Sequence, residues 1–506
     1  MFKYKLIILL FILFAAFILR AQRFDFPLSY VFAWGDGTRD YLVADHIIRY
    51  RELPLVGPYN LLYESGIRNS PIYFYLLALF LMPFNHILTL AGVNIILQLG
   101  VIVLVYLITK RIFDESSALA ASAFFSFNPE IIKHADFIWQ PYLMQPVALL
   151  ALLFLLKGHI QKKYQYMVLA LGLLILAISI HISAFSWLPA FLIICFYFLK
   201  KQKKRLKFYL GIIFTAIITF FVLYFPPIIF YLNSKVHNLF NLSLPLHAFS
   251  VKGYLENLFL NIAQFSKYFY LDPLPLVIFL FAGILLVVLS KNSLKSKNSF
   301  ITLLLLFISS FAAAAFLNKV RIQYLIPSFV VLTILVAKII SQFHFPLRIA
   351  LILSFVIIFS GNLSFIRDAK LPLENQKIID DLTSAVLKKL VEVKRVDGFE
   401  KFDFFQIVSF AQDKTTFEYP TLDTILLVSL EKKLQRKLTA VSDKSPYNHL
   451  QINDKKYLVV FCFRFYQSLD RVSCEIHFKK SYPDYHLTSS FYNNDRMTVY
   501  LAKFAD

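Results

Sequence analysis

Residues 4–19 read YKLIILLFILFAAFIL, and this stretch decides the class of the fold. Lys5 is its one charged residue, so it has the composition of a membrane-spanning helix. Lys3 and Lys5 predict a cytoplasmic N-terminus. No small-residue cleavage site follows, so we expect a retained first span rather than a cleaved signal peptide. Similar apolar runs recur to about residue 365, which predicts about eleven to thirteen transmembrane helices.

The composition of the whole chain supports a multi-pass membrane protein. Of 506 residues, 58% are hydrophobic and only 16% are charged, whereas a soluble domain is nearer half apolar and a quarter charged. The net charge of +21 would suggest nucleic acid as a partner of a soluble protein. Here the Lys and Arg residues gather in short loops between apolar runs, so membrane topology explains them and we expect no nucleic-acid partner.

The basic loops also predict which segments face the cytoplasm. These loops are Lys157–Lys163, Lys200–Lys207, Lys291–Lys297 and His344–Arg348. Two spans fit between successive loops, and a last span over about 347–365 then carries residues 366–506 to the outer face of the cell membrane. Lys110 and Arg111 also have cytoplasmic character. Because 71–109 holds two apolar helices after an external loop, either one helix is short or re-entrant, or this basic pair is external.

Residues 366–506 have the composition of a small extracytoplasmic α/β domain, distinct from the all-α membrane domain of residues 1–365. Their patterns predict helices at 374–394 and 423–436, and strands near 403–410, 456–465 and 497–504. Cys462 and Cys474 would be able to form a disulfide in an oxidising compartment, although two free thiols fit the sequence as well.

The first external loop, residues 20–71, carries the most informative polar residues. Apolar residues at helical spacing predict an amphipathic helix over 38–50 on the membrane surface, with Thr38 as its N-cap. Asp36 and Asp40 lie where this helix begins. A carboxylate near a helix N-terminus stays ionised, which suits a base that accepts a proton from a hydroxyl. A helix cap or a solvated loop acid explains the same residues equally well.

Further along the chain, polar and aromatic residues flank several predicted helix ends. The helix predicted to start at Pro71 is preceded by Arg68, a candidate phosphate ligand or headgroup anchor, and contains the interfacial Tyr73. Arg321 and Tyr324 are one helical turn apart at the outer end of a span, where they would bind an anionic phosphate or anchor the helix. Two further candidates are Trp139, in a short external loop, and His181, which is either a packing residue or an intramembrane functional group.

An Asp directly after the first span, a surface helix, and a Ser70-Pro71-Ile72-Tyr73 helix start resemble the polytopic GT-C glycosyltransferases. The sequence is most similar to the prokaryotic mannosyltransferase-like and lipid A aminoarabinose transferase-like branch. The resemblance covers about residues 1–365. The family has an acidic or amide residue after the Asp, where this chain has Gly37. We therefore assign no metal ligand, and a divalent cation as cofactor stays open, with Asp40 one turn on as the residue that would compensate.

The resemblance implies a defined reaction and a set of partners. Such enzymes take a sugar from a polyprenyl-phosphate carrier at the outer membrane face and transfer it to a lipid, glycan or protein acceptor. By resemblance, Asp36 is the base that deprotonates the acceptor hydroxyl, with Asp40 assisting, and attack opposite the leaving group inverts the anomeric carbon. Arg321, Arg68 and Tyr324 are the expected phosphate ligands, and Tyr73, Trp139 and His181 are further substrate-binding residues.

Two alternatives come from other functional classes. A polysaccharide polymerase or ligase would also use a lipid-linked chain, but such enzymes carry a large external loop late in the sequence. A transporter or flippase commonly has paired halves and helices broken by Gly or Pro near mid-bilayer. The chain has only 13 glycines and no visible internal repeat, which favours the transferase.

Overall fold

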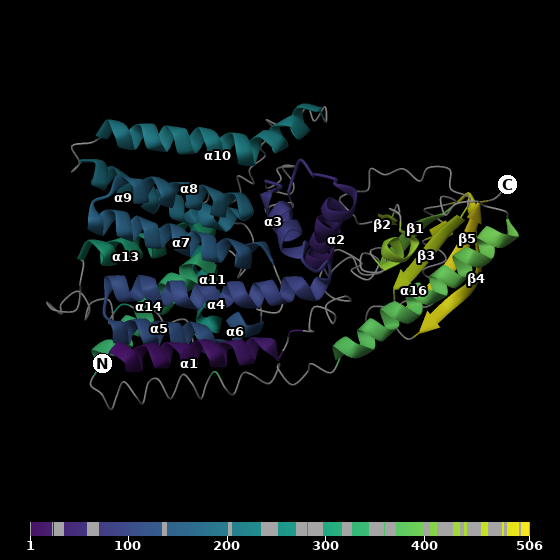
Figure 1. The fold of residues 1–506 in the computed structure, drawn as a ribbon, viewed down its shortest axis with the longest axis horizontal. Helices are drawn as coiled ribbons and strands as arrows, with labels where there is room; N and C mark the ends of the chain where they lie inside the picture. The colour runs from purple at the N-terminus through teal and green to yellow at the C-terminus, as the bar shows by residue number, and fades with distance from the viewer. Residues whose placement is uncertain are drawn as a thin grey trace. The chain divides into compact units, whose positions relative to one another are not determined.

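The structure, a computed structural model, divides into two compact units (Figure 1). The first unit comprises residues 1–24, 53–80 and 89–368, and the second comprises residues 25–52, 81–88 and 369–506. The structure describes residues 2–22, 24, 35–57, 70–133, 139–200, 205–233, 251–269, 281, 297–315, 326–343, 359, 371–397, 405–411, 429–435, 440–442, 457–463, 478–479, 483–494 and 497–504.

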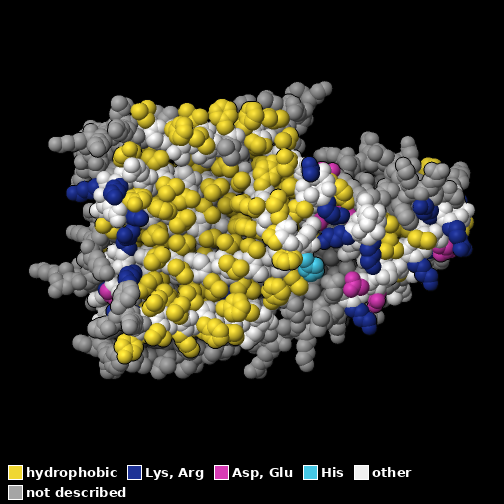
Figure 2. Space-filling model, viewed as in Figure 1, with side chains coloured by type: hydrophobic (Ala, Val, Ile, Leu, Met, Phe, Trp, Pro, Cys, Tyr) yellow, Lys and Arg dark blue, Asp and Glu magenta, His cyan; other side chains and the backbone are white. Residues whose placement is uncertain are grey.

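The first unit is built from helices that present apolar side chains outward, as expected for a protein surrounded by lipid. Figure 2 shows these side chains as a continuous yellow face with Lys and Arg gathered at the edge where α1 begins. Phe11 and Phe196 are among the most exposed, at 69% and 71%. The helices are α1 (Phe2–Ala21), α3 (Ile72–Leu81), α4 (Ile87–Ile112), α5 (Glu115–Phe127), α6 (Pro129–Lys133), α7 (Gln140–Gln161), α8 (Tyr164–Ile180), the 3-10 helix η4 (Ile182–Trp187), α9 (Leu188–Lys200), α10 (Arg205–Asn233), α11 (Val251–Phe269), α13 (Lys297–Ala315) and α14 (Ile326–Gln342).

Among the described residues, three helices are long and apolar enough to cross a membrane: α1, α4 and α7. The bent helix α10 would be a fourth. Several of the predicted spans, including the one at 347–365, lie largely outside the described residues. The expected total of eleven to thirteen therefore stays a prediction, while the all-α membrane architecture is confirmed.

A polar network fixes which helix ends of the first unit share a face. The Lys5 ammonium of α1 donates to the Glu115 carboxylate of α5 at 3.3 Å, and Lys110 of α4 donates to the same carboxylate at 2.8 Å. Tyr106 donates to it as well, at 2.7 Å. The start of α1 and the end of α4 therefore lie on the same side of the helical unit, which we call the N-terminal face.

The same reasoning orients α14 and α7. Near the end of α14, Lys338 donates to Asp114 at 3.0 Å, so α14 ends at the N-terminal face and begins at the opposite face. Ile326, the first residue of α14, packs with Trp139 and Tyr142 at the start of α7. Both helices therefore start at the face opposite the N-terminus.

This arrangement decides between the two alternatives for residues 71–109. Helix α1 begins at the N-terminal face and α4 ends there, so α1 ends and α4 begins at the opposite face. The chain between them, which includes α3, therefore starts and finishes at that opposite face. Helix α3 has ten residues and is about 15 Å long, too short for a hydrocarbon core of about 30 Å. The short-helix alternative is therefore the one that fits, and Lys110 lies on the same side as Lys5.

The second unit combines a helix of the first external loop with a C-terminal α/β fold. It contains α2 (Gly35–Tyr50), α16 (Leu371–Val396) and the strands β1 (Phe405–Ala411), β2 (Ala440–Ser442), β3 (Tyr457–Phe463), β4 (Tyr485–Asn494) and β5 (Met497–Phe504). The strand order is β2-β1-β3-β5-β4. Strands β1 and β2, and β1 and β3, are parallel, whereas β5 is antiparallel to β3 and β4.

The core of this sheet follows from the register of β3 and β5. Val460 pairs with Tyr500 and Leu458 pairs with Ala502, so alternate residues of both strands point to one face. These four residues, with Phe478, form a buried apolar cluster. The predicted α/β character of residues 366–506 is confirmed. Cys474 lies outside the described residues, so the choice between a Cys462–Cys474 disulfide and two free thiols lies outside them too.

Candidate functional site

The helix α2 carries Asp36 and Asp40, the two acidic residues singled out where the surface helix was predicted to begin. Within the described residues it begins at Gly35, three residues earlier than expected, so Thr38 lies inside the helix and the predicted N-cap is wrong. Asp36 is in the first turn, where the free amides favour a negative charge. Asp40 follows one turn later on the same side of the helix and is 1% exposed.

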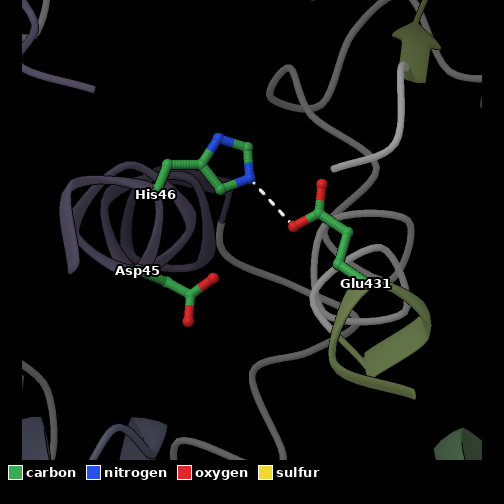
Figure 3. A group of neighbouring side chains, drawn as sticks. All are labelled: Asp45, His46 and Glu431. Carbon is green, nitrogen blue, oxygen red and sulfur yellow. Dashed lines mark hydrogen bonds and ion pairs between the residues drawn. The ribbon is translucent and has the colours of Figure 1, made fainter. Parts of the chain in front are cut away.

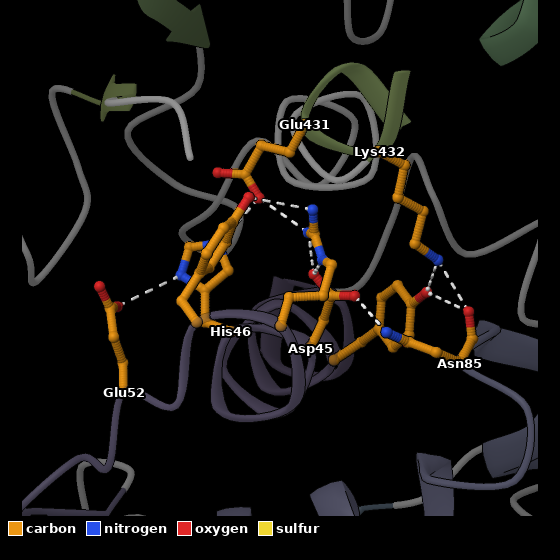
Figure 4. Close-up of polar contacts among 9 residues, drawn as sticks. Asp45, His46, Glu52, Asn85, Glu431 and Lys432 are labelled. Atoms are coloured by element: carbon orange, nitrogen blue, oxygen red, sulfur yellow. Dashed lines mark hydrogen bonds and ion pairs between the residues drawn. The ribbon is translucent and has the colours of Figure 1, made fainter. Parts of the chain in front are cut away.

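The polar side of α2 is covered by protein, which differs from the surface helix expected from the sequence. Asp45 and Glu431 have fully buried side chains, and both accept hydrogen bonds from Arg49. The Arg49 Nε donates to Asp45 Oδ2 at 2.7 Å, and its Nη2 donates to Glu431 Oε2 at 2.8 Å and also to Asp45 Oδ2. One guanidinium thus joins two carboxylates that are separated by hundreds of residues in the chain (Figure 4).

A second set of contacts involves the loop that joins α3 to α4. The Asn85 side-chain amide donates to Asp45 Oδ1 at 2.6 Å. The Lys432 ammonium donates to the Asn85 backbone carbonyl at 2.7 Å and to the Tyr41 hydroxyl at 3.1 Å. Glu431 and Lys432, adjacent in the helical residues 429–434, therefore hold α2 and this loop together.

These contacts also shift the pKa values of their partners. Burial raises the pKa of the Tyr41 hydroxyl, and the nearby Asp45 charge raises it further, so Tyr41 stays protonated. Burial lowers the pKa of Lys432, although the Asp45 charge opposes that shift. Burial and the Lys432 charge both lower the pKa of His86, which therefore favours its neutral form.

Asp45, His46 and Glu431 contain the donor types of a metal site, and their ligand atoms all lie within 4.8 Å of one another (Figure 3). Carboxylate oxygens with one imidazole suit zinc or manganese. However, His46 Nε2 is 3.0 Å from Glu431 Oε2, and Arg49 donates to both acids. A metal would have to displace this guanidinium. The three residues fit an ion-pair network better than a metal centre, so we assign no metal to them.

In the first unit, the predicted residues Tyr73 and Trp139 lie in packed positions. Tyr73, one residue into α3, is fully buried beside Phe74. Its helix starts as predicted, with the Ser70 hydroxyl accepting from the Ile72 amide at 3.4 Å. Trp139 precedes α7 and packs with Tyr142 and Ile326.

His181 lies at a break between helices rather than deep within a continuous pair. It ends α8 and precedes η4, and its Nδ1 accepts from the Ser183 amide at 3.3 Å and is 2.8 Å from the Ser183 hydroxyl. Because α8 runs back from the α7 hairpin, this break is at the same face as Trp139. The predicted phosphate ligands Arg68, Arg321 and Tyr324 lie outside the described residues.

The residues that organise α2 most directly were not among the sequence candidates. Asp45 and Arg49 lie within the amphipathic helix predicted over 38–50, and Glu431 lies within the helix predicted at 423–436. One available signal was the i, i+4 spacing of Asp45 and Arg49, which is typical of an ion pair on a helix. Nothing in the sequence links this pair to Glu431.

Comparisons with known proteins bear on this fold and on part of its sequence. Residues 68–230 match the family described as dolichyl-phosphate-mannose-protein mannosyltransferase. No curated protein sequence matches the chain at a significant level.

Solved structures of ArnT from Cupriavidus metallidurans have a similar fold. The form bound to undecaprenyl phosphate is 11% identical with a TM-score of 0.61, covering 99% of this chain and 98% of that one. The apo form is 11% identical with a TM-score of 0.62, covering 97% of each chain. The likeness extends over both the helical part and the C-terminal sheet region.

Proposed function

We propose that this chain is a membrane glycosyltransferase of the GT-C superfamily and that it transfers a sugar from a polyprenyl-phosphate-linked donor to an acceptor at the outer membrane face. The observation that carries the proposal is the near full-length likeness to an ArnT structure bound to undecaprenyl phosphate, combined with the mannosyltransferase match over residues 68–230. Lipid-linked glycosyl transfer in general is what these two findings support.

Asp36 is the proposed general base. A sugar phosphate carries a leaving group that is already weakly basic, so the reaction needs little acid catalysis. The protein must instead remove the acceptor proton and stabilise the charge that develops on the phosphate. The position of Asp36 in the first turn of α2 supports this role, because a helix N-terminus keeps a carboxylate ionised. Attack from the side opposite the phosphate would invert the anomeric carbon.

The phosphate is proposed to be held where α14 begins. Arg321 and Tyr324 are five and two residues before Ile326, which packs with Trp139 and Tyr142 at the face opposite the N-terminus. A guanidinium makes a bidentate, charge-assisted contact with phosphate oxygens, which suits Arg321. Arg68, just before α3, is the second proposed ligand. Tyr73, Trp139 and His181 are proposed to shape the substrate site.

The proposed topology places the N-terminus in the cytoplasm and residues 366–506 outside the cell membrane. It is supported by the basic residues at the N-terminal face, where Lys5 and Lys110 share the Glu115 carboxylate. This topology would expose the starts of α7 and α14 to the outer leaflet, where a lipid-linked donor would be presented.

The roles of the two acids are separated by substitution. Asp36→Asn keeps the size of the side chain and removes the base, so turnover should fall by roughly a hundredfold or more. The assay measures undecaprenyl phosphate released from undecaprenyl-phosphate-linked sugars by full-length protein in detergent. Asp40→Asn is the matched variant one helical turn away and should retain more activity. If Asp40→Asn is inactive and Asp36→Asn is active, the base is Asp40.

A further inference from the structure

The helix α2 is held along a stripe of residues, one per turn, and by the adjacent His46, which is 3.0 Å from Glu431. Tyr41, Asp45 and Arg49 are spaced by four residues and therefore line one side of the helix. The exposed fractions of the Asp45 and Arg49 side chains are 0% and 19%. Within the part of the chain that the structure describes, the three residues contact two other segments through hydrogen bonds and ion pairs: the loop around Asn85 and the pair Glu431–Lys432 (Figure 4).

The contact from Glu431 is made by a charge that is fully removed from water. Its side chain is 0% exposed, and one of its oxygens accepts from Arg49 at 2.8 Å and lies 3.0 Å from His46 Nε2. Charge-assisted hydrogen bonds of this kind are stronger and more directional than neutral ones. Lys432 adds the contacts with Tyr41 and Asn85 from the next position in the chain. Together these contacts fix the rotation of α2 about its own axis and its position along that axis, both relative to residues 429–434 and the loop around Asn85.

The proposed base is carried by the same rigid helix. Asp36 is five residues before Tyr41, which corresponds to about 7.5 Å along the helix axis. Successive residues of a helix differ by about 100° in direction, so a shift of one residue in the seating of α2 would turn Asp36 away from its target. A misplacement of about 1 Å can cost a hundredfold in rate.

We propose that Glu431 and Lys432, in the C-terminal segment, are positioning residues for glycosyl transfer, holding α2 so that Asp36 meets the acceptor hydroxyl. This inference rests on the proposed function, because it assumes that Asp36 is the base. It gives the C-terminal segment a role in the reaction through residues 429–434. Neither residue touches the reacting atoms, so their effect passes through α2.

The test is a double-mutant cycle between Glu431→Gln and Asp36→Asn in the full-length protein. Glu431→Gln keeps the shape and removes the charge, so kcat should fall about tenfold with the KM for the undecaprenyl-phosphate-linked sugar nearly unchanged. In the Asp36→Asn background the same change should cost less than twofold, because no base is left to misplace. Lys432→Met should behave in the same way. Glu392→Gln, at an exposed ion pair of α16 with Lys389 at 3.1 Å, is the control and should leave kcat unchanged.

Amide hydrogen exchange of residues 35–50 supplies a readout that does not depend on turnover. Exchange should speed up in Glu431→Gln and not in Glu392→Gln. Equal losses of activity in both Asp36 backgrounds, or unchanged exchange in α2, would overturn the positioning role. Absence of turnover in the wild-type protein would instead remove the proposed function and the positioning role with it, while faster exchange in Glu431→Gln would still establish the contact.

Discussion

Replacing Arg49 by Met should lower the free energy of unfolding of the second unit. The size of the loss depends on how deeply its partners Asp45 and Glu431 are buried. The guanidinium is the shared donor to Asp45 and Glu431, whose side chains are both fully buried. Without it, two carboxylates of like charge remain out of water. Met preserves most of the volume of the Arg stem, so the change tests charge rather than packing.

The expected loss is large because a broken buried pair costs more than the pair contributes when intact. Removing one partner of a buried ion pair typically costs about 3–5 kcal/mol. For a domain of this size, each kcal/mol lowers the melting temperature by about 2–4 °C, so Arg49→Met should melt roughly 6–20 °C lower. Arg49→Lys should lie between wild type and Met, since one ammonium group replaces a planar fork with several donors.

Thermal unfolding of the purified variants in one detergent measures this loss. The informative control is the triple variant Asp45→Asn, Arg49→Met and Glu431→Gln, which leaves no buried unpaired charge and should recover much of the lost stability. Wild-type stability in Arg49→Met would refute the view that the three residues form a closed buried network. A triple variant no more stable than the single one would show that Arg49 acts through packing instead.

Three further outcomes are expected. The pKa of His86 is lowered by burial and by Lys432, so the folded protein resists protonation of this side chain. Stability should hold above about pH 6.5 and decline as the pH falls below it, because the unfolded chain then binds a proton more readily. His86→Asn, which can still accept from the Leu88 amide, should weaken that decline in melting curves between about pH 7 and 5. A Cβ on Gly158 would meet Met167 Sδ at 2.7 Å and the Met167 backbone nitrogen at 3.1 Å, so Gly158→Ala should lower the free energy of unfolding by about 1–3 kcal/mol. Gly100→Ala, whose Cβ would meet no described atom beyond its own helix backbone within 4 Å, should leave the melting temperature unchanged. A reporter active only outside the cytoplasm should work when fused at Asp506, and activity of a cytoplasm-specific reporter there would reverse the topology.

Elements with a strong apolar pattern were predictable from the sequence. The strands β1, β3 and β5 are short apolar runs and lie within a few residues of the predicted 403–410, 456–465 and 497–504. The GT-C resemblance rested on Asp36 and the Ser70-Pro71 helix start; the mannosyltransferase family match over residues 68–230 and the ArnT-like fold agree with it. Strand β4 was missed because YHLTSSFYNN is too polar to be recognised as a strand, although its pairing with β5 places Leu487 against the core.

Features that depend on distant contacts were not predictable. Gly35 and Gly37 are poor helix formers, so local preferences favoured a helix start at Thr38, whereas the helix extends to Gly35. Arg49 and Glu431 are 382 residues apart, and neither stands in a motif that points to the other. Helix periodicity cannot distinguish a face covered by water from one covered by another part of the chain. The sequence therefore predicted a surface helix and not the burial of the ionisable face of α2.

The central claim is lipid-linked glycosyl transfer, and the most direct measurement is the fate of a defined donor incubated with the purified full-length protein. We would supply undecaprenyl-phosphate-linked sugars, beginning with mannose, together with a membrane extract as the source of acceptor, and follow the sugar and the lipid separately. We predict that undecaprenyl phosphate is released, that the sugar appears on an acceptor with inverted anomeric configuration, and that both products are lost in Asp36→Asn. Movement of intact donor across the bilayer of proteoliposomes, with the sugar–phosphate bond unbroken for every sugar tried, would contradict transfer and identify a flippase instead.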